Sequence, residues 1–179
     1  MGAVKVENIP HYTYADYKEW EGNWELINGI PYAMSPAPMI KHQKISNNIA
    51  WLLKNSLEEC TECHALLPVD WKISDDTIVQ PDNLVVCYEP SGAYITKAPT
   101  MIFEVLSPKT AKKDTTVKFD IYEKEGVKYY IIVNPDDHVA KVYRLHEGKY
   151  IKTTDATDEK LTFDLEKCTI EINFAKLWK

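Results

Sequence analysis

The chain has no apolar run that approaches the roughly 20 residues of a membrane-spanning helix. Its first seven residues lack the apolar core of a secretory signal, so we expect a cytoplasmic protein with no membrane partner. Internal repeats and low-complexity segments are also lacking. With 179 residues, 45% of them hydrophobic and 27% charged, the chain has the composition of an ordinary folded protein. We expect a single domain that spans residues 1–179.

An excess of positive charge is lacking as well. The net charge of −6 argues against a broad basic surface for nonspecific nucleic-acid binding, although a local basic patch remains compatible with it. The most basic long stretch, residues 109–128, closely follows Glu104. Its lysines are Lys109, Lys112, Lys113, Lys118, Lys124 and Lys128.

Cysteine is scarce, with four residues in the chain. The segment from Cys60 to His64 matches the C-x-x-C-H pattern of haem c attachment. Because the chain lacks an export signal and an evident axial partner, we favour a structural role for this segment. A zinc half-site is a further alternative, although no second cysteine pair lies at finger spacing. Cys87 and Cys168 lie in strand-like runs and are expected to be small core residues.

Local patterns predict a mixed α/β fold, in which helices flank a central sheet that carries extra antiparallel strands. Asn28-Gly29 separates two strand-like segments and predicts a type I′ hairpin. A long helix is expected over residues 41–59, where an apolar stripe at helical spacing comprises Ile45, Ile49, Leu52, Leu53 and Leu57. The other expected elements are a short helix at 13–20, a loop at 35–38, strands at 64–73, 77–87 and 100–106, a helix at 111–125, strands at 127–133, 138–145, 149–153 and 161–172, and a helical turn at 174–178.

One carboxylate stands inside a run that otherwise indicates a buried strand. Glu104 lies within residues 101–106, and the period of two places it on one face with Ile102. A bare buried carboxylate costs several kcal/mol, so it normally has a cation, a metal ion or a proton as its partner. Asp82 precedes another strand-like run and follows Pro81, whose missing N–H favours a strand edge or a bulge. Two acids on neighbouring strands suggest a metal site; the alternative is a turn cap and a salt-bridged strand residue.

The helix after Glu104 adds a basic group. Its spacing predicts that Val117, Ile121 and Tyr122 face inward, with Lys118 on their flank. Lys118 can therefore extend to solvent or point at the acids. A surface ion pair with Asp114, worth about 0.2–0.5 kcal/mol, is the alternative. Two acids and a lysine suit metal-assisted phosphodiester hydrolysis, because Mg²⁺ takes oxygen ligands and an ammonium group can orient water and stabilise developing charge.

Pro81-Asp82 followed by Glu104 in a strand resembles the PD-(D/E)XK core of restriction-endonuclease-like proteins. The wider pattern, over roughly residues 12–178, resembles the Uma2 branch of these nucleases. The segments that carry this resemblance are Trp24-Glu25-Leu26-Ile27-Asn28-Gly29, Met34-Ser35-Pro36, His42-Gln43, Gln80-Pro81-Asp82, Glu104-Val105-Leu106-Ser107-Pro108, Asp114, Lys118, Tyr122, Gly126-Val127 and Tyr130-Ile131-Ile132-Val133-Asn134-Pro135.

The resemblance implies a restriction-endonuclease-like core, Mg²⁺ held by Asp82 and Glu104 with Mn²⁺ as a substitute, and DNA cleavage. The general nuclease motif has a lysine two residues after the glutamate, where this chain has Leu106. In the Uma2 branch that lysine lies on the following helix, and it maps to Lys118.

The resemblance also implies roles for Glu25, as an extra metal or water ligand, and for His42, as a contact to phosphate or to a metal-bound water. A hairpin glutamate paired with a surface lysine, and a capping or core histidine, are the alternatives. Ser107 is expected to end its strand and cap the next turn.

Two functions stay open. The first is a Mg²⁺-dependent DNA endonuclease, which Asp82, Glu104 and Lys118 favour because a binding module needs no buried acids. The second is a noncatalytic protein that uses the same fold for binding or assembly, which the acidic net charge favours. A homodimer is expected from the need to cut two DNA strands and from the 11 Tyr and 5 Trp residues, which could seal an interface.

Overall fold

The computed structural model describes residues 9–34 and 37–179. The N-terminal residues that lack a signal core, and Ser35 and Pro36 of the expected loop, lie outside the described residues. The elements are α1 (Tyr14–Tyr17), β1 (Trp24–Ile27), β2 (Ile30–Ala33), α2 (Ile40–Ser56), β3 (His64–Leu66), β4 (Trp71–Ser74), β5 (Thr77–Val79), β6 (Asn83–Val86), β7 (Met101–Val105), α3 (Ala111–Thr115), α4 (Val117–Lys124), β8 (Tyr129–Asn134), β9 (Val139–His146), β10 (Lys149–Ala156), β11 (Lys160–Asp164), β12 (Thr169–Asn173) and the 3₁₀ turn η2 (Phe174–Lys176).

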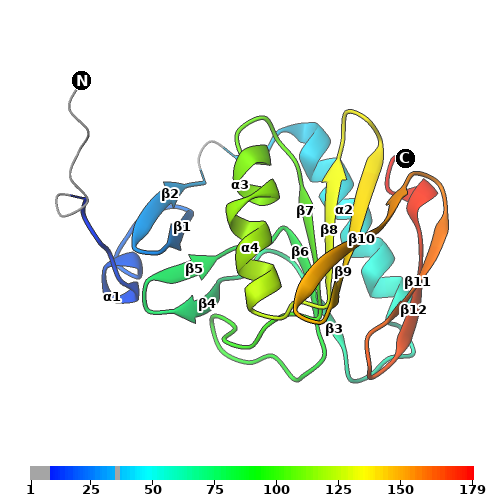
Figure 1. Ribbon diagram of the computed structural model, residues 1–179, viewed down its shortest axis with the longest axis horizontal. Helices are drawn as coiled ribbons and strands as arrows, with labels where there is room; N and C mark the ends of the chain where they lie inside the picture. Colours follow the sequence, from blue (N-terminus) through cyan, green and yellow to red (C-terminus); the bar gives the residue numbers. More distant parts are fainter. Residues whose placement is uncertain (1–8, 35–36) are drawn as a thin grey trace.

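The strands form a large mixed sheet and two smaller sheets. The large sheet has the strand order β10-β9-β8-β7-β6-β3, and β7 and β8 are its parallel pair. A four-stranded sheet with the order β2-β1-β5-β4 lies at one end of the molecule beside α1, and the β11-β12 hairpin lies at the other end (Figure 1). The sheet is therefore mixed, as the sequence predicts.

Two apolar layers cover the opposite faces of the large sheet. On one face, α2 and the β11-β12 hairpin pack against side chains such as Phe103 and Ile131. On the other face, Tyr122 of α4 and Trp71 of the small sheet pack against Ile102 and Ile132. Side chains alternate along a strand, so Glu104 points to the second face, with Ile102. The expected face of Glu104 is confirmed.

Several local expectations are confirmed. Asn28 and Gly29 have φ of 50° and 75°, as a type I′ turn requires, and β1 pairs with β2 across them. The apolar stripe of α2 is buried against the large sheet. Ser107 lies just after β7, and its hydroxyl accepts a hydrogen bond of 3.3 Å from the N–H of Thr110.

The expected strand over residues 77–87 is in fact two strands in different sheets. β5 belongs to the small sheet and β6 to the large sheet, and the chain crosses between them at Gln80-Pro81-Asp82. Pro81 has no N–H to donate to a ladder, so strand pairing stops there. The strand expected over 64–73 is likewise divided, into β3 and β4. The crossing places Asp82 where the two sheets meet.

The expected helix over residues 111–125 is interrupted at Thr116, which has φ −126° and ψ −81°. The hydroxyls of Thr115 and Thr116 donate to the carbonyls of Ala111 and Lys112, four residues back, at 2.7 and 2.6 Å. Such bonds compete with the helical backbone and bend it. The interruption also overturns one prediction, because Val117 is exposed at 36% rather than facing the core.

The cysteines correct another expectation. Cys87 and Cys168 are not unpaired core residues, since disulfides join Cys60 to Cys168 and Cys63 to Cys87. Nε2 of His64 lies 3.2 Å from a carboxylate oxygen of Glu89. This arrangement gives the C-x-x-C-H segment a structural role and does not favour haem attachment.

None of the helices within residues 9–34 and 37–179 has both the length and the apolarity that a bilayer crossing demands.

Candidate active site

Glu104 lies at the C-terminal end of β7 and is only 2% exposed. Oε1 of Glu104 accepts two hydrogen bonds, each 2.8 Å long, from Nζ of Lys118 and from the hydroxyl of Tyr122. Both donors come from α4, one helical turn apart, so a single face of the helix holds the carboxylate. Of the two orientations that the sequence left open for Lys118, the structure shows the one that points at the acids.

Asp82 is held beside the same strand. Oδ2 of Asp82 accepts a 2.8 Å hydrogen bond from the backbone N–H of Val105, the residue after Glu104. Nε2 of His42 lies 3.1 Å from the same oxygen, and His42 stands in the first turn of α2. The hydroxyl of Ser46, one turn further along α2, donates to Oδ1 of Asn83 at 2.8 Å. The N-terminal end of α2 is thereby docked against the segment that carries Asp82.

Glu25 brings a third carboxylate from β1 of the small sheet. Its side chain is fully buried, and Oε1 lies 2.8 Å from Nζ of Lys118. The backbone N–H of Gln80 donates to the same oxygen at 2.9 Å, and Nζ of Lys113 contacts Oε2. Glu25 therefore pairs with a buried lysine and a mostly buried one, not with the surface lysine that was the alternative. It links β1 to both short helices.

Asp114 is a fourth carboxylate, whose place in the site was not foreseen. The sequence offered a surface ion pair between Asp114 and Lys118 as an alternative, and the burial of both side chains rules out that alternative. Asp114 is 2% exposed, Lys118 is 1% exposed, and Oδ1 of Asp114 lies 3.7 Å from Nζ of Lys118. The spacing of four residues indicated that Asp114 and Lys118 interact, but spacing alone does not predict whether a pair is buried. Lys113 and Tyr122 are further side chains of the site that the chemical argument missed.

Burial and charge shift the ionisation of this cluster in different directions. Burial raises the pKa of Glu104 well above its ordinary value; the ammonium of Lys118 opposes this rise and the carboxylate of Asp82 reinforces it. Burial likewise raises the pKa of Asp114. Burial lowers the pKa of Lys118, but Glu104 and Glu25 outweigh it and leave that pKa well above its usual range.

Two carboxylates of the cluster, Glu25 and Asp82, favour their charged forms. Burial raises the pKa of Glu25, but Lys118 and Lys113 outweigh it and leave the pKa below its ordinary value. For Asp82 too, burial raises the pKa and is outweighed, here by the hydrogen bond and charge of His42. Burial lowers the pKa of His42, and the pairing with Asp82 raises it above 6.5.

The cluster opens into a cavity of about 640 Å³, whose lining includes Asp82, Glu104, Asp114 and Lys118. His42 lines it from α2, and Lys113 from α3. The five residues expected from the sequence therefore lie in one cluster. Four of them line the cavity, and Glu25 is paired with Lys113 and Lys118, which line it too.

The sequence model of the Uma2 family, described as "Putative restriction endonuclease", matches residues 14–173. This chain belongs to the Uma2 family. The matched range includes every residue of the cluster, and family membership places the chain among restriction-endonuclease-like nucleases. A comparison with curated proteins finds no match for this Uma2 chain.

Among solved structures, this Uma2 protein is similar to the crystal structure of "a putative nuclease belonging to DUF820" from Anabaena variabilis. The two chains are 18% identical; the likeness covers 93% of this chain and 97% of the other, with a TM-score of 0.76. At this identity the likeness shows the fold, and it confirms the mixed α/β architecture that the sequence predicts.

The donor set of this Uma2 site suits a divalent cation. If every group is ionised, the four carboxylates carry one negative charge more than Lys113, Lys118 and protonated His42 can balance. Oδ1 of Asp114 is buried and has no hydrogen-bond partner within the described part of the chain. An excess of buried negative charge needs either a proton or a cation. Carboxylate oxygens are the ligands that Mg²⁺ prefers, so the residues fit the metal.

Proposed function

We propose that this Uma2 protein is a Mg²⁺-dependent endonuclease that hydrolyses phosphodiester bonds of DNA. The observation that carries the proposal is the buried Glu104, which shares one cavity with Asp82 and is held by the ammonium group of Lys118. Family membership supports the nuclease class; the metal, the DNA substrate and the residue roles are the proposal.

Asp82 and Glu104 would hold the Mg²⁺ ion, for which Mn²⁺ would substitute. When bound, such an ion polarises a phosphate oxygen and lowers the pKa of a coordinated water. Each of the two carboxylates has one oxygen committed to protein donors, namely Oδ2 of Asp82 and Oε1 of Glu104. The other oxygen of each carboxylate would be available to bind the ion.

The chain's own groups position these ligands. Lys118 and Tyr122 fix the orientation of Glu104, and Lys118 also ties it to Glu25. His42 and the N–H of Val105 fix Asp82. Preorganised donors of this kind need no rearrangement when charge develops in the transition state, which is where their electrostatic contribution is largest.

The rim of the cavity favours a polyanionic substrate although the protein as a whole is acidic. Lys109, Lys112 and Lys113 line the cavity from the segment after β7, and Lys109 and Lys112 are exposed. Lysines that meet phosphates release counterions, so DNA binding should weaken steeply as salt rises. We further propose that the enzyme acts in the cytoplasm as a homodimer, so that two sites cut the two strands.

Plasmid nicking in Mg²⁺ tests the proposal. Asp82→Asn and Glu104→Gln remove a ligand charge with little change in volume. Each should lower the nicking rate by on the order of 100-fold or more, since even the groups behind metal ligands contribute about 10–100-fold. Asp120→Asn, which removes an exposed carboxylate from α4, is the matched control and should nick at the wild-type rate. EDTA should abolish nicking.

Thermal unfolding of each variant checks that the fold is retained. Nicking that persists in both Asp82→Asn and Glu104→Gln would place the activity elsewhere and defeat the proposal. A folded wild-type protein that never nicks DNA, with Mg²⁺ or Mn²⁺, would instead favour the noncatalytic alternative.

A further inference from the structure

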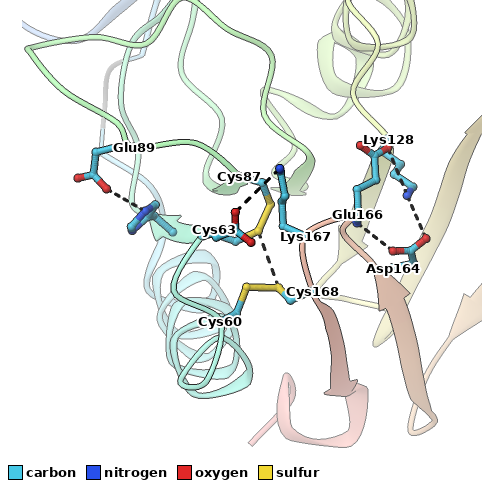
Figure 2. The surroundings of a disulfide bond; sticks show 11 residues. Cys60, Cys63, Cys87, Glu89, Lys128, Asp164, Glu166, Lys167 and Cys168 are labelled. Atoms are coloured by element: carbon cyan, nitrogen blue, oxygen red, sulfur yellow. Dashed lines mark hydrogen bonds and ion pairs between the residues drawn. A yellow bond between two sulfur atoms is a disulfide. The ribbon is translucent and has the colours of Figure 1, made fainter.

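The four cysteines come from three separate segments of the chain and meet at one point (Figure 2), and none of them lines the cavity. Cys60 follows α2 and Cys168 directly precedes β12. Cys63 directly precedes β3 and Cys87 directly follows β6, and these two strands are paired, with His64 opposite Val86. The fold therefore supplies the second cysteine pair that sequence spacing does not reveal.

The sulfur atoms lie closer together than the two disulfides require. Sγ of Cys63 lies 3.8 Å from Sγ of Cys168, although each belongs to a different disulfide. Sγ atoms of Cys60, Cys63 and Cys168 all lie within 4.8 Å of one another. In a tetrahedral zinc site with Zn–S bonds of about 2.3 Å, neighbouring sulfurs are about 3.8 Å apart. The sulfurs of Cys60, Cys63 and Cys168 therefore lie within the dimensions of such a site, and Cys87 is bonded to Cys63.

We propose that Cys60, Cys63, Cys87 and Cys168 form a tetrahedral Zn²⁺ site when their disulfides are reduced, so that this cluster is bridged either by two disulfides or by one zinc ion. Cys60 and Cys63 supply the C-x-x-C pair that is typical of structural zinc sites, and Cys87 and Cys168 complete the four ligands. Four thiolates leave no open position, which marks the site as structural rather than catalytic.

The interconversion balances with a dithiol reductant. Two dithiol molecules each give two electrons and two protons to one disulfide and become disulfides themselves, which leaves four thiols on the protein. Zn²⁺ then replaces the four thiol protons, so binding strengthens as pH rises. Opening of the disulfides frees the bonded sulfurs to move apart by side-chain rotation, and the backbones of Cys63 and Cys87 stay side by side through the pairing of β3 and β6.

The cluster joins elements that also carry the active site. Cys60 follows the helix whose first turn contains His42, and Cys87 directly follows the strand that begins after Asp82. The 17 residues of α2 place the two ends about 25 Å apart. Zinc at this position would crosslink α2, the large sheet and the β11-β12 hairpin without contacting the substrate.

Metal analysis of the full-length protein tests the proposal. The protein is reduced with a water-soluble phosphine and desalted under argon. Each disulfide takes two electrons from one phosphine, while water supplies the oxygen atom of the phosphine oxide and the two thiol protons. Thiol titration should give four thiols per chain, and loading should leave one Zn²⁺ per chain. X-ray absorption should then show sulfur ligands at about 2.3 Å, and Co²⁺ should give the visible absorption of a tetrahedral thiolate site.

Cys168→Ser should bind Zn²⁺ at least about tenfold more weakly, since a hydroxyl is a poor replacement for a soft thiolate. Thr169→Ala, which changes the exposed neighbour, is the control and should bind as wild type does. His64→Gln should also bind as wild type does, because His64 is not a ligand. If Cys168→Ser does not fold, the wild-type metal count and the X-ray absorption spectrum decide alone.

Three results would overturn the proposal. The first is a reduced protein with four free thiols that holds no Zn²⁺. The second is an oxidised protein without thiols that binds Zn²⁺ equally well, and the third is loss of binding in His64→Gln.

Discussion

Replacement of Lys118 by methionine tests how the carboxylate cluster is held together. Nζ of Lys118 lies 2.8 Å from Oε1 of Glu104 and 2.8 Å from Oε1 of Glu25, and its side chain is 2% exposed. The figure of about 0.2–1 kcal/mol for surface ion pairs therefore does not apply. Removal of one partner from a buried pair costs about 3–5 kcal/mol, because the remaining charge is left uncompensated.

Methionine keeps most of the apolar stem, so little of this loss is a cavity effect. We expect Lys118→Met to lower the free energy of unfolding by about 3–5 kcal/mol. For a chain of this length, 1 kcal/mol shifts Tm by about 2–4 °C, so Tm should fall by about 6–20 °C. The assay is urea and thermal unfolding at pH 7.5 in EDTA, with Lys124→Met on the exposed side of α4 as the matched control.

The loss of stability in Lys118→Met should shrink as pH falls. Burial holds the folded-state pKa of Glu104 above its unfolded value. Such a group contributes stability that is fully present below the unfolded pKa, near 4.5, and is lost as pH rises through the folded pKa. Because the Lys118 ammonium opposes this rise, its removal should raise the pKa of Glu104 further, and the variant should recover part of its deficit between pH 7.5 and pH 5. A deficit under about 1 kcal/mol, or one equal to that of Lys124→Met, would refute the buried ion pair.

Two further predictions concern the partners of the acids, both in metal-free protein. Tyr122→Phe should lower the free energy of unfolding by about 1.5–3 kcal/mol, because it removes a buried hydrogen bond to the Glu104 carboxylate; calorimetry that finds no change would contradict that contact. His42→Gln should lose stability below pH 6.5 relative to wild type, and the difference should fade as pH rises through the raised pKa of His42, since the protonated ring is the form that Asp82 stabilises. Urea unfolding from pH 5.5 to pH 9 measures this difference, and one that grows with pH would contradict the pairing.

The parts of the fold that short segments dictate could be predicted from the sequence. The hairpin at Asn28-Gly29 follows from the φ angles that its turn requires, and the apolar stripe of α2 from helical spacing. The odd position of Glu104 was visible because its neighbours are apolar. The break at Thr116 was missed, although two consecutive threonines can bond back to the helix carbonyls.

Contacts between distant segments were harder to predict from the sequence. Glu25 reaches the cluster only because β1 pairs with β5, and β5 leads into the crossing at Asp82. Nothing in the sequence near Cys168 indicates Cys60, which is 108 residues away. The burial of Asp114 and Lys118 could not be predicted either. The two residues have the spacing of a surface pair, and only the packing of α3 and α4 on the sheet buries them. The resemblance to Uma2 proteins identified residues that local chemistry alone would not have joined.

Metal binding between the two acids is the central claim, and diffraction from Mn²⁺-soaked crystals tests it most directly. The account predicts one anomalous peak within bonding distance of both Asp82 and Glu104, and its disappearance in crystals of Glu104→Gln. A map without a peak, in which the two carboxylates point away from each other, would contradict the account.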